Sequence, residues 1–413
     1  MNLLKRETYL SKIRPWYEKN YILALTGIRR CGKSELLKQI QQEIVASGVP
    51  TDHILSFDLE GKSGKGLKDL DSVEQRLNRL IQDKDRYYVF FDEVQHIRSF
   101  EEVLAYIRDS YNVSLFVTGS NSKLLHGKLQ DRLTGRAKEF VVRPFSYEES
   151  REFRLLNHLP IADRPNEDLL EYLAYGGMPQ RYDGTQEDVY PYLDGVYESI
   201  VEKDIFSNHK GMNQNAFQRF SRYLISTSGR VFSALSTAKA MNPSLPNEKA
   251  KAQANVLSNY ANYCLESYFL EACSPYYLQG KEALSGAKKF YAIDTGLRNA
   301  LSADKRGYDI GFSLENAVFN ELRSRGYEVS YGKLRNGEVD FVVSRNRKHC
   351  FLQVCYLLSS EEIKEREFRP LEKIPGRSPC YVISMDEFDG SENGIGHLNA
   401  YDFFTGKKDI VLL

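Results

Sequence analysis

A glycine-containing turn near the amino end of the chain has the residue types and spacing of a phosphate-binding loop. It fits G-x-x-x-x-G-K-[ST], in which Gly27, Gly32, Lys33 and Ser34 take the fixed places. The glycines allow main-chain N–H groups to curve around a triphosphate. Lys33 is expected to reach the β- and γ-phosphates, and the Ser34 hydroxyl to bind Mg²⁺. The sequence therefore predicts a site for ATP and Mg²⁺. The nucleotide-binding candidates in this turn are Gly27, Ile28, Arg29, Arg30, Cys31, Gly32, Lys33, Ser34 and Glu35.

The segments on either side of the turn suit this chemistry. The apolar run Tyr21–Leu25 predicts a buried strand, and the pattern after Ser34 predicts a helix with one apolar face. Such a helix directs its positive amino end at the phosphates. The alternative is a chance match in a loop, which the strand before and the helix after disfavour.

A second apolar run, Tyr87–Phe91, ends directly in two acids, Asp92 and Glu93. We expect Asp92, at the carboxyl end of a strand, to hold Mg²⁺ through water. We expect Glu93 to orient and polarise the attacking water as a general base. The alternative is a strand that ends in a solvated acidic turn, and the phosphate-binding pattern elsewhere in the chain makes it the weaker interpretation.

The strand predicted over Val113–Thr118 is followed by polar residues. Ser120 or Asn121 would sense the γ-phosphate and the attacking water from this strand end. The alternative is that one of them only caps a helix over Ser122–Leu133. Arg136 is the candidate for an arginine that supplies charge in the transition state, in its own chain or across a subunit boundary. Its alternative is an ordinary solvated arginine.

Strands that alternate with helical patterns predict an α/β fold with a parallel sheet covered by helices on both faces. At 413 residues the chain exceeds one compact core, so we expect two or three domains. Lys plus Arg and Asp plus Glu both total 56, so overall charge selects no class of partner. Six cysteines without paired metal spacing suit a reducing compartment. Without a signal-peptide core or a run of about 18 apolar residues, a cytoplasmic protein without membrane contact is expected.

The motifs TGIRRCGKS, FFDEVQ, TGSNSKLL, LTGR and RPFSYEE follow one another along the chain. In this order they resemble the prokaryotic AAA+-like ATPases of the archaeal-ATPase type, which belong to the additional-strand class of P-loop ATPases. The resemblance implies an ATPase core over residues 1–150. It also implies a helical lid or linker over residues 151–210, in which a GG-x-P element, Gly176-Gly177 and Pro179, joins the core to the lid. A carboxyl-terminal region of unassigned function follows, which we divide into residues 211–305 and 306–413.

Residues 211–305 show three helical patterns and two short strand-like segments, the arrangement of a winged helix. The third helix, expected over Asn255–Glu271, would enter a DNA groove. The strand-like segments, Tyr276–Leu278 and Lys289–Ile293, would form the wing. The alternative is a structural or protein-contacting module. The lysines expected on DNA phosphates are Lys281, Lys288 and Lys289, with Lys249 and Lys251 as support.

Residues 306–413 resemble the PD-(D/E)XK nucleases in layout. Glu315 on a helix and Asp340 on the second strand match that layout, and Gln353 stands at the second acidic position. Cys355 stands where the lysine should be, and a thiol cannot replace an ammonium. Lys333 or Lys348 could supply the charge from a neighbouring strand. We therefore expect the nuclease-like fold with a residual acidic pair and without activity.

These observations lead to one interpretation and two alternatives. The chain is expected to bind and hydrolyse Mg·ATP and to couple its nucleotide state to carboxyl-terminal domains. Those domains would contact DNA or a protein partner, and the chain could assemble as a homo-oligomer. One alternative is a nucleotide-controlled switch with slow hydrolysis, and the other is an ATP-gated, metal-dependent nuclease.

Overall fold

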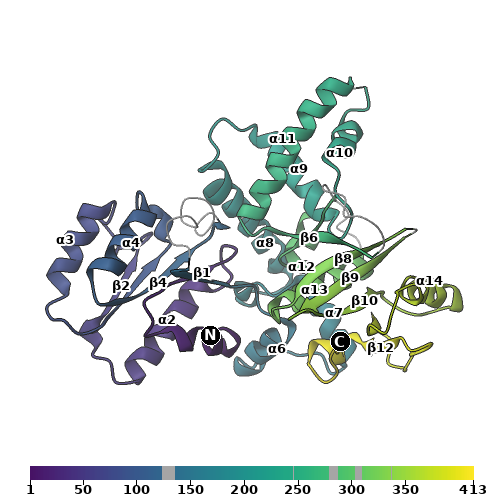
Figure 1. Cartoon of the computed structure of the whole chain (residues 1–413), viewed down its shortest axis with the longest axis horizontal. Helices are drawn as coiled ribbons and strands as arrows, with labels where there is room; N and C mark the ends of the chain where they lie inside the picture. Colours follow the sequence, from purple (N-terminus) through teal and green to yellow (C-terminus); the bar gives the residue numbers. More distant parts are fainter. Residues whose placement is uncertain (123–134, 245, 279–286, 303–308, 336) are drawn as a thin grey trace. The chain divides into compact units, whose positions relative to one another are not determined.

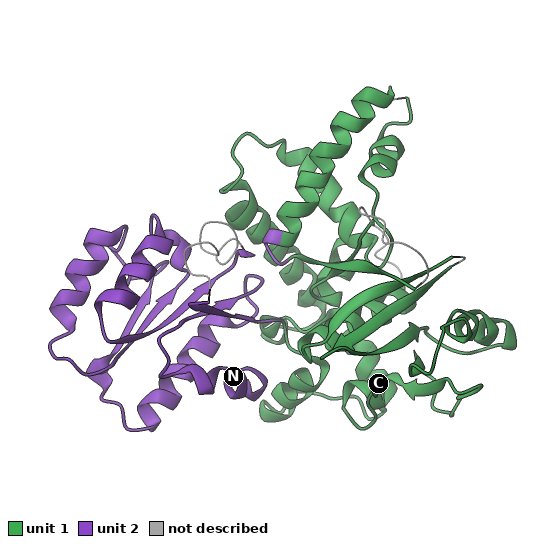
Figure 2. Cartoon of the chain, viewed as in Figure 1, with its two compact units in different colours: residues 1–2, 144–265, 269–413 green, residues 3–143, 266–268 purple. Residues whose placement is uncertain are grey.

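The computed structural model describes residues 1–122, 135–244, 246–278, 287–302, 309–335 and 337–413. The chain divides into two compact units (Figure 2). Unit 1 consists of Met1–Asn2, Pro144–Leu265 and Phe269–Leu413. Unit 2 consists of Leu3–Arg143 and Glu266–Tyr268, so a short segment from late in the chain belongs to the amino-terminal unit.

Unit 2 is built on a five-stranded sheet with the order β2-β3-β4-β1-β5, in which every neighbouring pair is parallel (Figure 1). This confirms the predicted α/β fold with a parallel sheet. The strands are β1 (Ile22–Thr26), β2 (Ile54–Asp58), β3 (Tyr87–Asp92), β4 (Val113–Gly119) and β5 (Ala137–Val141). The helices are α1 (Glu7–Ile13), α2 (Lys33–Ala46), α3 (Leu70–Leu80) and α4 (Phe100–Ser110).

Apolar residues on both faces explain why these strands are central. β1 and β4 are buried along their whole lengths, as expected of parallel strands covered on both faces. On one face, alternate strand residues pack with residues of α3 and α4 in a single core. α2 packs on β1, β3 and β4. The carboxyl ends of these three strands meet at one edge of the sheet, where parallel α/β folds bind ligands.

Unit 1 begins with helices. They are α6 (Tyr147–Leu156), α7 (Pro165–Tyr175), α8 (Val189–Ile200), α9 (Gln214–Ser226), α10 (Ala234–Met241), α11 (Asn247–Glu266) and α12 (Thr295–Leu301). A π-helical segment over Val201–Phe206 continues α8. Our third helix, expected to end at Glu271, was placed too late. α11 ends at Glu266, and Tyr268 has a left-handed φ of 55° that no helix continues through.

A seven-stranded mixed sheet with the order β12-β11-β10-β9-β8-β6-β7 completes unit 1. Its strands are β6 (Leu270–Tyr277), β7 (Lys289–Ala292), β8 (Glu328–Leu334), β9 (Gly337–Arg345), β10 (Lys348–Val354), β11 (Cys380–Ser384) and β12 (Gly396–Asn399). The helices α13 (Ile310–Ser324), α14 (Glu361–Glu372) and α15 (Ala400–Phe404) accompany it. The two segments expected to form a wing do not pair with each other over the expected residues. β7 pairs with the first half of β6, Leu270–Cys273, whereas Tyr276 and Tyr277 pair with β8 and so extend the sheet that contains β8 to β12.

The GG-x-P element is a point of close backbone approach within unit 1. The Gly177 N–H donates to Asp294 Oδ2 at 2.7 Å, and the Gly177 carbonyl accepts from Phe145 N at 2.8 Å. A Cβ on Gly177 would lie 2.0 Å from the Phe145 oxygen, and one on Gly176 would lie 2.2 Å from Asp294 Oδ1. A larger residue at either position would therefore clash with these atoms.

Gly177→Ala is expected to lower the free energy of unfolding by about 3 kcal/mol, because backbone must move to admit the methyl group. Gly195→Ala is the matched control, since a Cβ there meets no atom within 4 Å and the residue lies inside α8. The control is expected to stabilise the protein by about 0.5–1 kcal/mol. Thermal unfolding measures both. Equal melting temperatures for the two variants would contradict the steric explanation.

Candidate functional site

The turn after β1 has the backbone of a phosphate-binding loop. Gly27 and Gly32 have φ values of 139° and 100°, and Arg30 between them has a φ of 66°. A Cβ on Gly27 would lie 2.1 Å from the Val142 oxygen, so only glycine fits there. Gly32 caps the amino end of α2, and the helix begins at Lys33. The helix therefore directs its first N–H groups toward the loop.

The Lys33 side chain is buried and spans the loop. Its Nζ donates to the carbonyl oxygens of Gly27 at 3.0 Å and of Ile28 at 3.1 Å. The same Nζ lies 3.9 Å from Glu93 Oε1. The ammonium is thus held at the loop and beside one of the two predicted acids.

Asp92 and Glu93 lie at the end of β3 and share a partner on β4. The Thr118 hydroxyl donates to Asp92 Oδ1 and accepts from the Glu93 N–H at 2.8 Å. The Ser34 hydroxyl also hydrogen-bonds to Asp92. Burial raises the pKa of the Asp92 carboxyl. The structure therefore places Ser34, Asp92 and Glu93 close together.

Thr118 is a residue that our sequence reasoning missed. It is the last residue of the run VSLFVT, and we assigned a role only to the polar residues after that run. Its position at the carboxyl end of a strand next to β3 was the available signal, because β3 and β4 pair in parallel up to Phe91 and Val117.

Glu93 has a left-handed backbone, with a φ of 57°, and its side chain is nearly buried. Such a conformation is costly for a non-glycine residue and is found where a site fixes it. Gln95 Nε2 donates to Glu93 Oε2 at 2.5 Å. The carboxylate is therefore oriented from two directions, by its own backbone and by this amide.

Ser120 and Asn121 lie at the same edge of the sheet. Gly119, which precedes them, pairs with Thr26, the last residue of β1 before the loop. Ser120 is fully buried and Asn121 is half-buried. The helix expected to begin at Ser122 falls on residues 123–134, which lie outside the described residues.

Arg136 lies at the opposite end of the sheet. Its carbonyl oxygen accepts from the Ile22 N–H at 3.0 Å, and Ile22 is the first residue of β1, whereas the loop follows the last one. A strand of this length spans about 13 Å. The side chain of Arg136 therefore does not reach the loop of its own chain, and that alternative was wrong. The alternative across a subunit boundary remains.

Arg6 supports the loop from the start of α1. Its Nη1 donates to the carbonyl oxygens of Cys31 at 3.2 Å and of Arg143 at 2.9 Å, and its side chain is buried. The Cys31 thiol donates to the Val142 oxygen at 3.2 Å, and burial raises its pKa. Cys31 is therefore a neutral packing residue of the loop. No motif marked Arg6 in the sequence.

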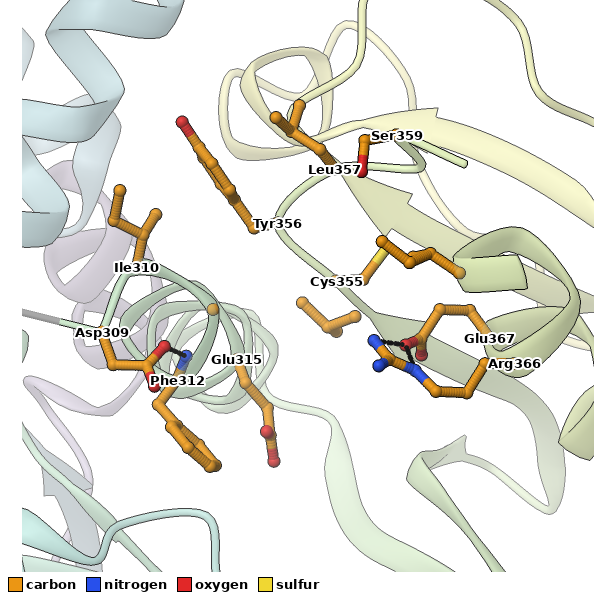
Figure 3. Close-up of a pocket in the computed structure, with 13 residues that line it drawn as sticks. Asp309, Ile310, Phe312, Glu315, Cys355, Tyr356, Leu357, Ser359, Arg366 and Glu367 are labelled. Atoms are coloured by element: carbon orange, nitrogen blue, oxygen red, sulfur yellow. Dashed lines mark hydrogen bonds and ion pairs between the residues drawn. The ribbon is translucent and has the colours of Figure 1, made fainter. Parts of the chain in front are cut away.

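The second cluster of predicted residues lies in unit 1. Glu315 on α13 lines a pocket of about 610 Å³, together with Cys355 after β10 and Glu367 on α14 (Figure 3). Burial raises the pKa of Cys355 to about 12, so this thiol stays neutral. Asp340 lies at a β-bulge, because Asp340 and Phe341 both stand opposite Tyr331 between the pairs Ser330–Val342 and Gly332–Val339. Bulges of this kind redirect side chains.

Lys289 was expected on DNA phosphates and is instead buried in this cluster. Its Nζ lies 2.8 Å from Glu338 Oε1 and 4.0 Å from Glu315 Oε1. The side chain is 3% exposed, so it cannot contact a DNA backbone. Lys281 lies outside the described residues, and Lys288 is exposed.

The acidic and amide side chains of this cluster accept hydrogen bonds from protein donors. Gln353 Oε1 accepts from the Asp340 N–H at 2.8 Å, and Asp340 Oδ2 accepts from the Val354 N–H at 2.9 Å. Glu315 Oε1 accepts from the Tyr291 hydroxyl at 2.6 Å. These oxygens already have protein donors, and a buried ammonium lies beside them. Within the described ranges, no three His, Cys, Asp or Glu side chains are placed to hold a metal ion.

Lys289→Met is expected to lower the free energy of unfolding by about 3 kcal/mol, because it leaves buried carboxyls without their cation. Burial raises the pKa of Glu315 and of Asp340. An acid whose pKa is higher in the folded than in the unfolded state lowers the free energy of unfolding as pH rises through the folded pKa. The loss of stability in Lys289→Met should therefore grow with pH. Urea unfolding at several pH values measures it. The exposed Lys288→Met is the control, and a loss that is equal in both variants or independent of pH would contradict the buried role.

Comparison with known proteins agrees with this description of unit 2. Residues 19–151 match the family model of an AAA domain. This part of the chain is therefore similar to AAA domains. Residues 166–307 match a domain of unknown function, DUF8612. In the described part of the chain, no helix is long and apolar enough to cross a membrane.

Two relatives match most of the chain. An uncharacterized protein of Haemophilus influenzae is 28% identical over 356 residues, which cover 86% of this chain and 87% of the relative. An uncharacterized protein of Methanocaldococcus jannaschii is 28% identical over 368 residues, which cover 86% of this chain and 78% of the relative. Both matches therefore extend over the residues similar to an AAA domain and over the region that follows them.

Solved structures match weakly. The Aeropyrum pernix ORC1 protein in complex with DNA is 12% identical, with a TM-score of 0.31, and the match covers 74% of this chain and 94% of that one. The Saccharomyces cerevisiae Hsp104–ADP complex is 16% identical, with a TM-score of 0.33, and the match covers 65% and 40%. TM-scores at this level assign neither a partner nor an activity.

Proposed function

We propose that this chain is an ATPase that couples Mg·ATP binding and hydrolysis to its carboxyl-terminal region. The observation that carries the proposal is the meeting of Lys33, Ser34, Asp92 and Glu93 at one edge of a parallel sheet. A buried lysine, a hydroxyl and two adjacent acids at a glycine loop are the set that phosphoryl transfer to water requires. The match to an AAA domain supports it.

Each residue has a role in this proposal. The backbone from Gly27 to Glu35 holds the phosphates, and Lys33 neutralises their charge. The donor set fits magnesium, because the Ser34 hydroxyl and the Asp92 carboxylate already adjoin. When bound, Mg²⁺ would neutralise charge on the phosphate oxygens. Glu93 orients a water and accepts its proton, and Ser120 or Asn121 senses the γ-phosphate.

The carboxyl-terminal region is proposed to be the part that responds to the nucleotide. We propose lid, winged-helix and nuclease-like segments over residues 151–210, 211–305 and 306–413. DNA is the first candidate partner, since Lys249, Lys251 and Lys288 are exposed. A protein partner is the alternative. Arg136 would act on the site of a neighbouring copy, which makes a homo-oligomer part of this proposal.

A slow nucleotide-controlled switch is the second candidate, and one observation favours it. The Gln95 amide donates to Glu93 Oε2 at 2.5 Å, so this oxygen is already occupied by a protein donor and must give it up before it can take a water. ATP turnover with and without DNA separates the two functions. Fast, DNA-stimulated turnover supports the ATPase that acts on DNA, whereas tight ATP binding with slow, DNA-independent turnover supports the switch. Failure to bind ATP would overturn both.

A further inference from the structure

Three residues from late in the chain belong to the unit that contains the phosphate loop. Residues 266–268 are part of unit 2, while α11 before them and β6 after them are part of unit 1. The segment is therefore held by unit 2 and joined covalently to two elements of the other unit.

Tyr268 ends a chain of hydrogen bonds that begins at the phosphate loop. The Thr26 hydroxyl donates to Glu139 Oε1 at 2.6 Å, and the Tyr268 hydroxyl donates to the same oxygen at 2.8 Å. Thr26 is fully buried and directly precedes Gly27. Glu139 lies on β5, in register with Ala24 of β1.

The Tyr268 backbone is held in an unfavourable conformation. Its φ of 55° is rare for a bulky side chain and persists only where surrounding contacts impose it. Burial, with the Glu139 carboxylate as the second cause, raises the pKa of the Tyr268 phenol. The phenol therefore remains a hydrogen-bond donor at neutral pH.

We propose that Tyr268 carries the nucleotide state of the ATP site to α11 and β6. The proposal rests on the proposed function. Phosphates bound by the Gly27 backbone shift Thr26, which is the next residue. That shift changes how Glu139 is shared between the two hydroxyls. Tyr268 then favours a different backbone arrangement, and its covalent neighbours in α11 and β6 follow.

The test uses the full chain and compares hydrogen exchange with and without a non-hydrolysable ATP analogue. In the wild-type protein the analogue is expected to slow exchange at the end of α11 and the start of β6. In Tyr268→Phe, which removes only the hydroxyl, that slowing should shrink by about fivefold or more. The affinity for the analogue should stay within about threefold of wild type, because no phosphate contact is lost.

Two further variants make the result decisive. Tyr276→Phe is the control, since Tyr276 lies on β6 and is 43% exposed. It should respond to the analogue as wild type does. Glu139→Gln keeps an accepting oxygen, so the analogue should slow exchange in this variant by an amount between those of wild type and Tyr268→Phe. If Tyr268→Phe does not fold, Glu139→Gln takes its place in the test. A wild-type response in Tyr268→Phe, or a loss of analogue affinity equal to the loss of response, would overturn the role of Tyr268. Absence of analogue binding in the wild-type protein would instead overturn the proposed function itself.

Discussion

Lys33→Ala is expected to raise the dissociation constant for ATP by about 10²-fold or more. The side chain is buried, and its ammonium is held between the carbonyl oxygens of Gly27 and Ile28. A triphosphate in the loop would place several negative charges where water is excluded. Without the ammonium these charges lose their main partner.

Isothermal titration with ATP and Mg²⁺ measures this effect. Lys38→Ala is the matched control, because Lys38 lies one turn further along α2 and its exposed ammonium pairs with Glu35. The control should bind ATP as wild type does. Equal affinities of Lys33→Ala and Lys38→Ala for ATP would contradict the assignment of this turn as a phosphate-binding loop.

Glu93→Gln is expected to bind ATP normally and to hydrolyse it about 10²-fold more slowly or worse. The amide preserves the size of the side chain but cannot accept a proton from water. Its neighbour Asp92 is unchanged, so the metal site stays intact. The Thr118 hydroxyl still fixes the backbone at this position, since it accepts from the N–H of residue 93.

Steady-state phosphate release gives the rate, and binding of ATP in the same variant gives the affinity. Glu101→Gln on α4 is a control for loss of one negative charge from this unit. Turnover at the wild-type rate in Glu93→Gln would transfer the role of base to another residue. A loss of ATP affinity together with the rate would indicate a structural effect.

The sequence predicted the parts of the site that follow directly from local pattern. An apolar strand that ends in a glycine turn or in paired acids can be recognised from a few adjacent residues. Parallel pairing of such strands then brings their carboxyl ends together. The position of Arg136 in the sheet could not be predicted in this way. Its neighbours in sequence suggested a place near the phosphates, but the register with Ile22 puts it at the other end of the sheet.

Contacts between residues far apart in the sequence were not predictable. Lys289 looked like one of several basic residues near a turn, and nothing local indicated that Glu315 and Glu338 would enclose it. Tyr268 and Glu139 are separated by 129 residues, and their hydrogen bond follows only from the complete fold. Thr118 differs, because its place at a strand end was visible and was overlooked.

Unit 2, which contains most of the residues that match an AAA domain, is made from two pieces of chain, Leu3–Arg143 and Glu266–Tyr268. A fragment that ends near residue 150 would therefore lack part of this unit. In that fragment Glu139 would have lost the Tyr268 hydroxyl that donates to it. Chimaeras that join this amino-terminal part to another protein would lack the same hydrogen bond. Exchange between relatives is safer when the donor supplies both pieces at once.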